Sequence, residues 1–259
     1  MALGFLTRLP LPDYRTALVA GVLLGTALAL WAGRRNGLPV MVVVDGVLAA
    51  AVGGLLLGRL GYVATHLPYF REHPLAAPAF WQGGLSAPGV VVGGAVGAGV
   101  MARLWKGQPQ GLPLPIWDAL APGAAVVLIA ASLGCLRAGC ACGRETWPGN
   151  GLLWVLSAEL PDLYGLRAPR VAVPVLGMGW GALMLVLTLP MARRSRTAAP
   201  GVTPRVTPTW LALYGLGEFA LGFLRGDAAP LIGGLSALQW AGLGILGAAI
   251  VLGILTANR

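Results

Sequence analysis

Four arginines and one glutamate near the ends of apolar segments have the clearest potential for chemistry in this sequence. They are Arg59, Arg137, Arg144, Arg225 and Glu218. A guanidinium group binds a phosphate through two parallel N–H donors, so the arginines would suit an anionic lipid headgroup held in a polar cavity. Ion pairs within the protein, or arginine side chains that extend to a membrane surface, would also account for each of them.

The three cysteines, Cys135, Cys140 and Cys142, lie close together in one glycine-containing stretch. Their C-x4-C-x-C spacing differs from the paired cysteines typical of zinc sites, and the two histidines, His66 and His73, are remote in sequence. An odd number of cysteines in one short stretch does not indicate a disulfide framework. We predict that they bind no metal and that small residues pack a tight turn here; no cofactor is predicted.

The elements that position these residues must be apolar, because the chain as a whole is apolar. Of its 259 residues, 57% are hydrophobic and 10% are charged, whereas soluble domains carry about 25% charged residues. The 40 glycines lie largely within the apolar runs, where small residues let helices pack closely in lipid. The composition predicts a single transmembrane domain over residues 1–259 and excludes a soluble fold.

Seven apolar runs are candidates to cross a hydrocarbon core of about 30 Å. They are residues 15–31, 38–57, 85–104, 117–136, 171–189, 210–223 and 235–255. The sequence therefore predicts an all-α integral membrane protein of about seven transmembrane helices. The sixth run is the shortest and contains Glu218. Asp45 and Asp118 fall within or beside other runs, where an unpaired carboxylate is costly.

Two connections are long enough to form structure of their own. Residues 137–170 are polar and rich in glycine and proline, which predicts a cap over one membrane face. Residues 61–82 contain three prolines and are interpreted as a re-entrant or surface loop with a short interfacial helix.

The distribution of basic residues predicts the orientation of the chain. The formal net charge is +9, and the bases lie at the ends of apolar runs, which favours membrane-edge anchoring over nucleic-acid binding. The short loops of one face carry basic residues and no acidic residue: Arg34, Arg35, Arg103, Lys106, Arg193, Arg194, Arg196 and Arg205. The positive-inside rule places that face in the cytoplasm. The amino terminus is then outside and the carboxyl terminus cytoplasmic.

Several segments, in the same order along the chain, resemble the bacterial prolipoprotein diacylglyceryl transferases. These segments are residues 57–63, 69–74, 83–86, 118–123, 134–144, 214–215, 223–227 and 235–239. The resemblance implies a seven-helix bundle in the bacterial inner membrane and a reaction that moves a diacylglyceryl group from phosphatidylglycerol onto a lipoprotein cysteine. It also implies that Arg59, Arg137, Arg144, Tyr214 and Arg225 surround the lipid headgroup.

The chain departs from the family pattern at the positions to which the resemblance assigns chemistry. Pro88 and Val173 stand where the family has histidines, and Ser132 replaces an arginine. The family's arginine and glutamate of the sixth span fall at Glu218 and Gly222. Thioether formation needs a deprotonated thiol and a stabilised leaving phosphate. These replacements remove the implied base and much of the implied anion clamp.

Two functions remain open at this stage. The first is a divergent, non-catalytic relative that binds phospholipid, with phosphatidylglycerol as the candidate, and serves as a subunit of a larger membrane complex with other membrane proteins. The alternative is an active diacylglyceryl or related lipid-headgroup transferase, whose replacement base would be His66 or Glu218.

Overall fold

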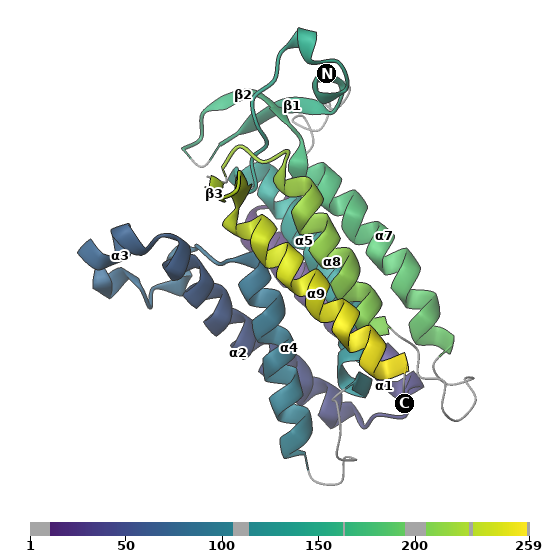
Figure 1. Ribbon diagram of the computed structural model, residues 1–259. Coiled ribbons are helices and arrows are strands. Elements are labelled where there is room, and N and C mark those ends of the chain that lie inside the picture. Colours follow the sequence, from purple (N-terminus) through teal and green to yellow (C-terminus); the bar gives the residue numbers. More distant parts are fainter. Residues whose placement is uncertain (1–10, 106–113, 163, 195–205, 228–229, 258–259) are drawn as a thin grey trace. The chain divides into compact units, whose positions relative to one another are not determined.

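Helices make up most of the chain in the computed structural model (Figure 1). The structure describes residues 11–105, 114–162, 164–194, 206–227 and 230–257. The long helices are α1 (Tyr14–Arg35), α2 (Val40–Thr65), α4 (Ala87–Leu104), α5 (Leu114–Ala138), α7 (Val173–Arg194), α8 (Val206–Gly222) and α9 (Ala237–Ala257). The predicted all-α membrane fold is confirmed.

Six of these helices, all except α8, are long and apolar enough to cross a membrane. They cover six of the seven predicted spans. The predicted sixth span corresponds to α8, which has 17 residues. At 1.5 Å per residue α8 is about 26 Å long, slightly less than the hydrocarbon core. The shortest of the seven predicted spans thus corresponds to the shortest of the seven long helices described above.

The connections contain short helices and two small hairpins. The short helices are α3 (Leu67–Glu72), η2 (Pro74–Ala76), η3 (Phe80–Gln82), η4 (Pro148–Asn150) and α6 (Leu152–Val155). The strands are β1 (Ser157–Pro161), β2 (Arg167–Val171), β3 (Pro230–Ile232) and β4 (Leu235–Ser236), and they form antiparallel pairs β1–β2 and β3–β4. The sequence analysis did not predict these strands.

Two predicted boundaries are wrong for local reasons. The predicted loop 61–82 begins too early, because α2 continues to Thr65 and the N–H of His66 still donates to the carbonyl of Tyr62 at 3.1 Å. The predicted seventh span begins too early, because Leu235 and Ser236 belong to β4.

The amino-terminal end of α1 is fixed by a capping aspartate. The hydroxyl of Thr16 donates to the carboxylate of Asp13, and the N–H of Ala17 donates to the carbonyl of Asp13 at 3.0 Å. An aspartate at this place also faces the positive end of the helix dipole. The hydrogen bond from Thr16 lowers the pKa of the Asp13 carboxyl. At the other end of α1, Arg34 and Arg35 suit the negative end.

Contacts within the chain define two compact units. The first unit consists of Met1–Ala27, Pro122–Pro190 and Pro208–Arg259, and the second of Leu28–Ala121 and Met191–Thr207. The residues 137–170 that the sequence assigns to a cap contain η4, α6 and the β1–β2 hairpin. The organisation as one transmembrane domain with a cap stays a prediction.

In the second unit, α2 and α4 pack with their backbones in close approach. Gly89, Gly93 and Gly97 are spaced four residues apart and therefore share one face of α4. A Cβ atom on any of them would come closer than 3.0 Å to a backbone oxygen of α2, those of Leu57, Gly53 and Ala49 respectively. Only glycine permits this separation, which is typical of helix pairs in lipid.

Asp118, a costly carboxylate in the sequence analysis, is paired within the second unit. It lies on α5 and is buried, and it accepts hydrogen bonds from the backbone N–H of Thr207, at 2.8 Å, and from the Thr207 hydroxyl. Thr207 is in the first turn of α8. The carboxylate therefore acts as a cap, supplied by another helix, for N–H groups that have no partner in α8 itself.

In the first unit, a chain of contacts connects α5, α7, α8 and α9, which Figure 1 shows with the β1–β2 hairpin beyond their ends. Gly181 of α7 faces Ile129 of α5, and the indole N–H of Trp180 donates to the carbonyl of Leu213 at 2.9 Å. Gly215 of α8 lies against the backbone of Gly242 in α9. Small residues and one tryptophan hydrogen bond thus hold these helices together.

Replacing Gly93 by alanine should destabilise the protein, whereas the same change at the neighbouring Gly94 should not. A Cβ at Gly93 would overlap the backbone of Gly53, but one at Gly94 would meet Ala50 at 3.5 Å, an ordinary contact. Overpacking of this kind costs about 1–3 kcal/mol. Thermal unfolding of both variants in detergent tests the expectation. Equal midpoints for Gly93→Ala and Gly94→Ala would contradict the close α2–α4 approach.

Candidate functional site

Four of the five predicted headgroup residues belong to the first unit. Arg137 lies in the last turn of α5, and Arg144 lies in the segment between α5 and η4. Tyr214 lies on α8, and Arg225 follows α8. Arg59 lies on α2 in the second unit. That these five residues surround a lipid headgroup stays a prediction.

An extended segment, residues 142–146, positions Arg144 beside the loop of Arg225. On one side, the N–H of Gly226 donates to the carbonyl of Cys142 and the N–H of Arg144 donates to the carbonyl of Leu224, both at 2.9 Å. On the other side, the N–H of Thr146 donates to Pro169 of β2 at 3.0 Å. The segment therefore ties the Arg225 loop to the β1–β2 hairpin.

Tyr214, Glu218, Arg225 and Asp227 form what we call the Arg225 cluster. Tyr214 is 2% exposed, and its hydroxyl donates to the carboxylate of Glu218 at 3.0 Å, one helical turn away. The guanidinium of Arg225 donates from Nε to Asp227 Oδ1 at 2.9 Å and from Nη2 to Asp227 Oδ2 at 2.8 Å. Three of these residues were predicted as candidates for chemistry, whereas Asp227 entered the prediction only as the end of the matching segment 223–227.

The charge of Arg225 is balanced within the cluster. Burial of the guanidinium disfavours its charge, but the hydrogen bonds and charge of Asp227, together with the charge of Glu218, outweigh burial and raise the pKa of Arg225. The guanidinium of Arg225 thus interacts with the carboxylates of Asp227 and Glu218. Its Nε and Nη2 donors, which could bind a phosphate in a bidentate manner, are already bonded to Asp227. An arriving phosphate would have to compete with that bidentate pair.

Arg144 and Arg137 retain most of their donors. Both side chains are exposed, and within the described part of the chain each makes one hydrogen bond, Arg144 to the carbonyl of Phe223 and Arg137 to the carbonyl of Leu11 at 3.1 Å. A guanidinium carries five N–H donors. These two arginines are therefore better placed than Arg225 to accept an anion from outside the protein.

Arg59 is engaged by the loop that follows its own helix. It is 9% exposed and donates to four backbone carbonyls, those of Ala76, Ala77, Gly83 and Gly84, at 2.5–3.0 Å. Its guanidinium also lies over the ring of Phe70, 5.3 Å from the centroid. These bonds leave one of its five N–H donors, so the observed role of Arg59 is to hold the loop in place.

Three of the positions at which the sequence suggests a departure from the family pattern, Pro88, Val173 and Gly222, lie in packed surroundings. Pro88 is buried in the first turn of α4, and Val173 is 4% exposed at the start of α7. At Gly222, an added Cβ would lie 2.5 Å from Cγ of Gln239. The side chain of Gln239 therefore occupies the space that a larger residue at position 222 would need.

Gln239 is fixed by a capping box at the start of α9. The N–H of Ser236 donates to Gln239 Oε1 at 2.9 Å, and the N–H of Gln239 donates to Ser236 Oγ at 3.3 Å. The Ser-x-x-Gln pattern is a helix-start signature visible in the sequence, which the sequence analysis did not use. Displacing Gln239 would therefore also weaken the capping of the amino-terminal end of α9.

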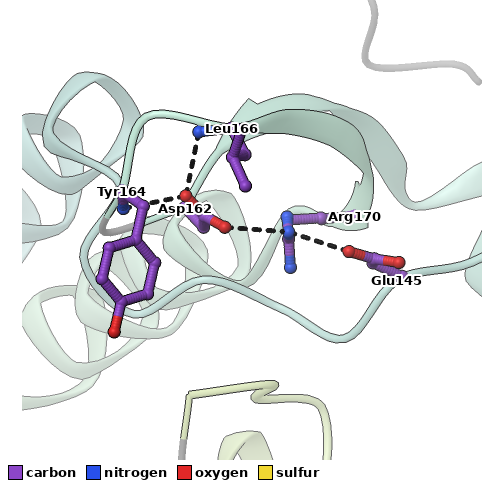
Figure 2. A network of polar contacts seen from close by, with 5 residues as sticks. All are labelled: Glu145, Asp162, Tyr164, Leu166 and Arg170. Carbon is purple, nitrogen blue, oxygen red and sulfur yellow. Dashed lines mark hydrogen bonds and ion pairs between the residues drawn. The ribbon is translucent and has the colours of Figure 1, made fainter.

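A second polar network stabilises the β1–β2 hairpin (Figure 2). Arg170 donates to Glu145 at 2.9 Å and to Asp162 at 3.3 Å, while Asp162 also accepts from the backbone N–H groups of Tyr164 and Leu166. Beneath the hairpin, Leu136, Ala158, Leu160 and Ala172 form a buried apolar cluster. The network shapes the turn of the hairpin, and the apolar cluster anchors it to α5 and α7.

The cysteines form no disulfide framework, but they do form one local disulfide that was not predicted from the sequence. Cys135 and Cys140 are bonded to each other, and Cys142 is a buried free thiol. The counting argument did not reveal it, because a single local bridge needs only two cysteines at a turn. In the described ranges, no three His, Cys, Asp or Glu residues are grouped to hold a metal ion; the absence of a metal in the protein stays a prediction.

The steric exclusion at position 222 can be measured as an energetic coupling. Gly222→Ala should destabilise the protein by about 1–3 kcal/mol, because the new methyl group overlaps Gln239. In a Gln239→Ala background the overlap is gone, so the same change should cost little. Thermal unfolding of both single variants and the double variant gives the coupling energy. Strictly additive effects would show that Gln239 does not fill this space.

Comparison with known proteins agrees with the resemblance seen in the sequence. The profile of the family described as prolipoprotein diacylglyceryl transferase matches residues 2–255. Phosphatidylglycerol–prolipoprotein diacylglyceryl transferase 2 of Clostridium perfringens is 23% identical, over 97% of this chain and 93% of its own length. The transferase of Thermus thermophilus is 30% identical, over 68% of this chain and 73% of its own length. That of Streptococcus agalactiae is 27% identical, over 88% and 84%. This chain is a multi-pass membrane protein that belongs to the prolipoprotein diacylglyceryl transferase family.

Proposed function

We propose that this protein is a non-catalytic member of its family that binds an anionic phospholipid and serves as a subunit of a larger membrane complex. The observation that carries the proposal is the packing at Gly222, where the Cβ atom of any larger residue, the glutamate implied by the family pattern included, would lie 2.5 Å from Cγ of Gln239. Both the side-chain oxygen and the backbone N–H of Gln239 are hydrogen-bonded to Ser236 in the capping box. A larger residue at position 222 would therefore require local repacking.

The state of the arginines supports the same proposal. Transfer chemistry needs a clamp on the departing phosphate and a base for the thiol. Arg225 is paired with Asp227, and Arg59 is bonded to four carbonyls, so neither offers a free bidentate face. Binding a lipid headgroup requires neither a base nor a clamp on a leaving phosphate, since an exposed cation beside apolar surface suffices. Arg144, with Arg137 as a second contact, is our candidate for the headgroup residue, and phosphatidylglycerol is the candidate lipid.

The alternative function is an active phosphatidylglycerol–prolipoprotein diacylglyceryl transferase or a related headgroup transferase. Relatives over most of the chain carry transferase names, and the carboxylate of the half-buried Glu218, hydrogen-bonded to Tyr214, is a group that could accept a proton. In this alternative Glu218 replaces the missing base. His66, the other candidate, stacks on Tyr62 with ring centroids 4.1 Å apart and belongs to the second unit.

One assay separates the two functions. Purified protein is mixed with phosphatidylglycerol vesicles and a peptide bearing a lipoprotein modification cysteine, and peptide and bound lipid are analysed by mass spectrometry. We expect no lipidated peptide above background, together with co-purified anionic phospholipid that falls several-fold in Arg144→Gln. The matched control is Arg167→Gln, which changes an exposed arginine at the start of β2.

Two outcomes would reject parts of this proposal. Lipidated peptide that disappears in Glu218→Gln would establish the alternative. Wild-type protein free of anionic lipid would remove the binding role and leave a scaffold. Co-purification from native membranes, with the complex resolved by gel filtration, tests for partner subunits; a protein that elutes alone would argue against that role.

For its location we propose the bacterial inner membrane, with the amino terminus outside and the carboxyl terminus in the cytoplasm. Two features support this orientation: the acid-free basic loops of the other face and the disulfide at the end of α5, since disulfides persist in oxidising compartments. In intact cells, a membrane-impermeant maleimide should label Tyr164→Cys, in the exposed hairpin turn, and not Leu104→Cys at the end of α4. The reverse labelling pattern would invert the topology.

A further inference from the structure

A disulfide closes the turn between α5 and the segment that carries Arg144. Cys135 lies in the last turn of α5, and its bond to Cys140 joins Cα atoms 4.8 Å apart. Between them the chain turns at Gly139, whose φ is +72°. A Cβ at Gly139 would come closer than 3.0 Å to the carbonyl oxygen of Asp162, so only glycine fits this turn.

The turn also contains a residue in an unfavourable backbone conformation. Ala141 has a φ of 53°, and it is the one described non-glycine residue with a positive φ. A residue with a Cβ is disfavoured there and stays so only when its surroundings hold it. The Cys135–Cys140 bond, which ends at the preceding residue, is the covalent part of that restraint.

The turn leads directly into the segment that positions the arginines of the candidate site. Cys142 is buried, its carbonyl accepts from the N–H of Gly226, and Arg144 donates its N–H to Leu224. Gly143 lies opposite Arg225 in an antiparallel bridge. A change in the turn therefore reaches the Arg225 loop through two backbone hydrogen bonds.

We propose that the Cys135–Cys140 pair is a thiol–disulfide exchange site, opened by a dithiol protein on the same membrane face, and that opening releases residues 142–146 from the Arg225 loop. In the exchange, one thiolate of the partner attacks a sulfur of the bond and forms a mixed disulfide. The partner's second thiolate then resolves it. Two thiols form on this chain and one disulfide forms on the partner, so electrons balance.

The three cysteines are suited to different parts in this exchange. Cys135 and Cys140 are half-buried, whereas Cys142 is 7% exposed, so the bonded pair is more accessible to an incoming thiolate than the free thiol. Burial, with the charge of Asp227, raises the pKa of the Cys142 thiol. A protonated, buried thiol is a poor nucleophile, so Cys142 does not exchange with the neighbouring bond.

Hydrogen exchange measured by mass spectrometry tests the proposal on the wild-type protein in detergent, with dithiothreitol as the dithiol. Maleimide labelling of samples that have been unfolded in denaturant first counts the thiols, and we expect one per chain, Cys142, before reduction and three after it. Reduction should then speed exchange at least threefold in peptides covering residues 140–146 and 222–227, and reoxidation should reverse the change. Peptides of α2 and α4 serve as the internal reference. Cys142→Ser should respond like wild type, and Cys135→Ser should exchange like the reduced protein.

Two results would overturn the proposal. Three free thiols in protein isolated without reductant would show that the bond does not form in the membrane. Unchanged exchange after complete reduction would show that the bond does not restrain the segment. Neither measurement involves a lipid, so the proposed phospholipid binding can fail while this proposal stands, and the reverse also holds. Reduction of the wild type keeps the test valid if Cys135→Ser does not fold.

Discussion

Asp118, Arg59 and Arg225, which lie on or beside the apolar helices, are paired within the protein itself, and much of its structure follows from that constraint. In a hydrocarbon environment water is not available to satisfy them, so an unpaired charge or polar group is very unfavourable. Asp118 is paired with the first turn of α8, Arg225 with Asp227, and Arg59 with four loop carbonyls. Each pairing also fixes a boundary: the start of α8, the loop after it, and the loop after α2.

The same constraint bears on function. A guanidinium that is fully engaged inside the protein is stable near the membrane, but it has little left to offer a phosphate. Arg59 is of this kind, and the bidentate face of Arg225 is occupied by Asp227, whereas Arg144 and Arg137 are exposed, each with one side-chain hydrogen bond to a described residue. Every arginine can in principle bind a phosphate headgroup. Whether a given arginine is free to do so depends on its hydrogen-bond partners within the protein. The non-catalytic proposal rests on this distinction and on the packing at Gly222.

Close packing by small residues is the second general feature. Along α2 and α4, three glycines face backbone oxygens at separations that no side chain allows. The glycines also place helix backbones in direct contact between α8 and α9. Lipid tails are as apolar as the side chains, so burying apolar surface between helices does not drive their association in a membrane. Close contacts of this kind supply the packing energy instead. This explains why glycine, a poor helix former in water, is abundant within the helices here.

The sequence by itself determined the fold class, six of the spans and the family. Long apolar runs have few structural alternatives in a membrane, since a helix satisfies every backbone group within one segment. It did not determine which charges are paired. Asp118 and Thr207 are 89 residues apart, and the four carbonyls bound by Arg59 lie 17 to 25 residues beyond it. The Cys135–Cys140 bond is local, yet it depends on left-handed backbone at Gly139 and Ala141 that residue spacing does not reveal. Only the tertiary structure decided these pairings, because hydrogen bonds and covalent bridges depend on distances that helix packing sets.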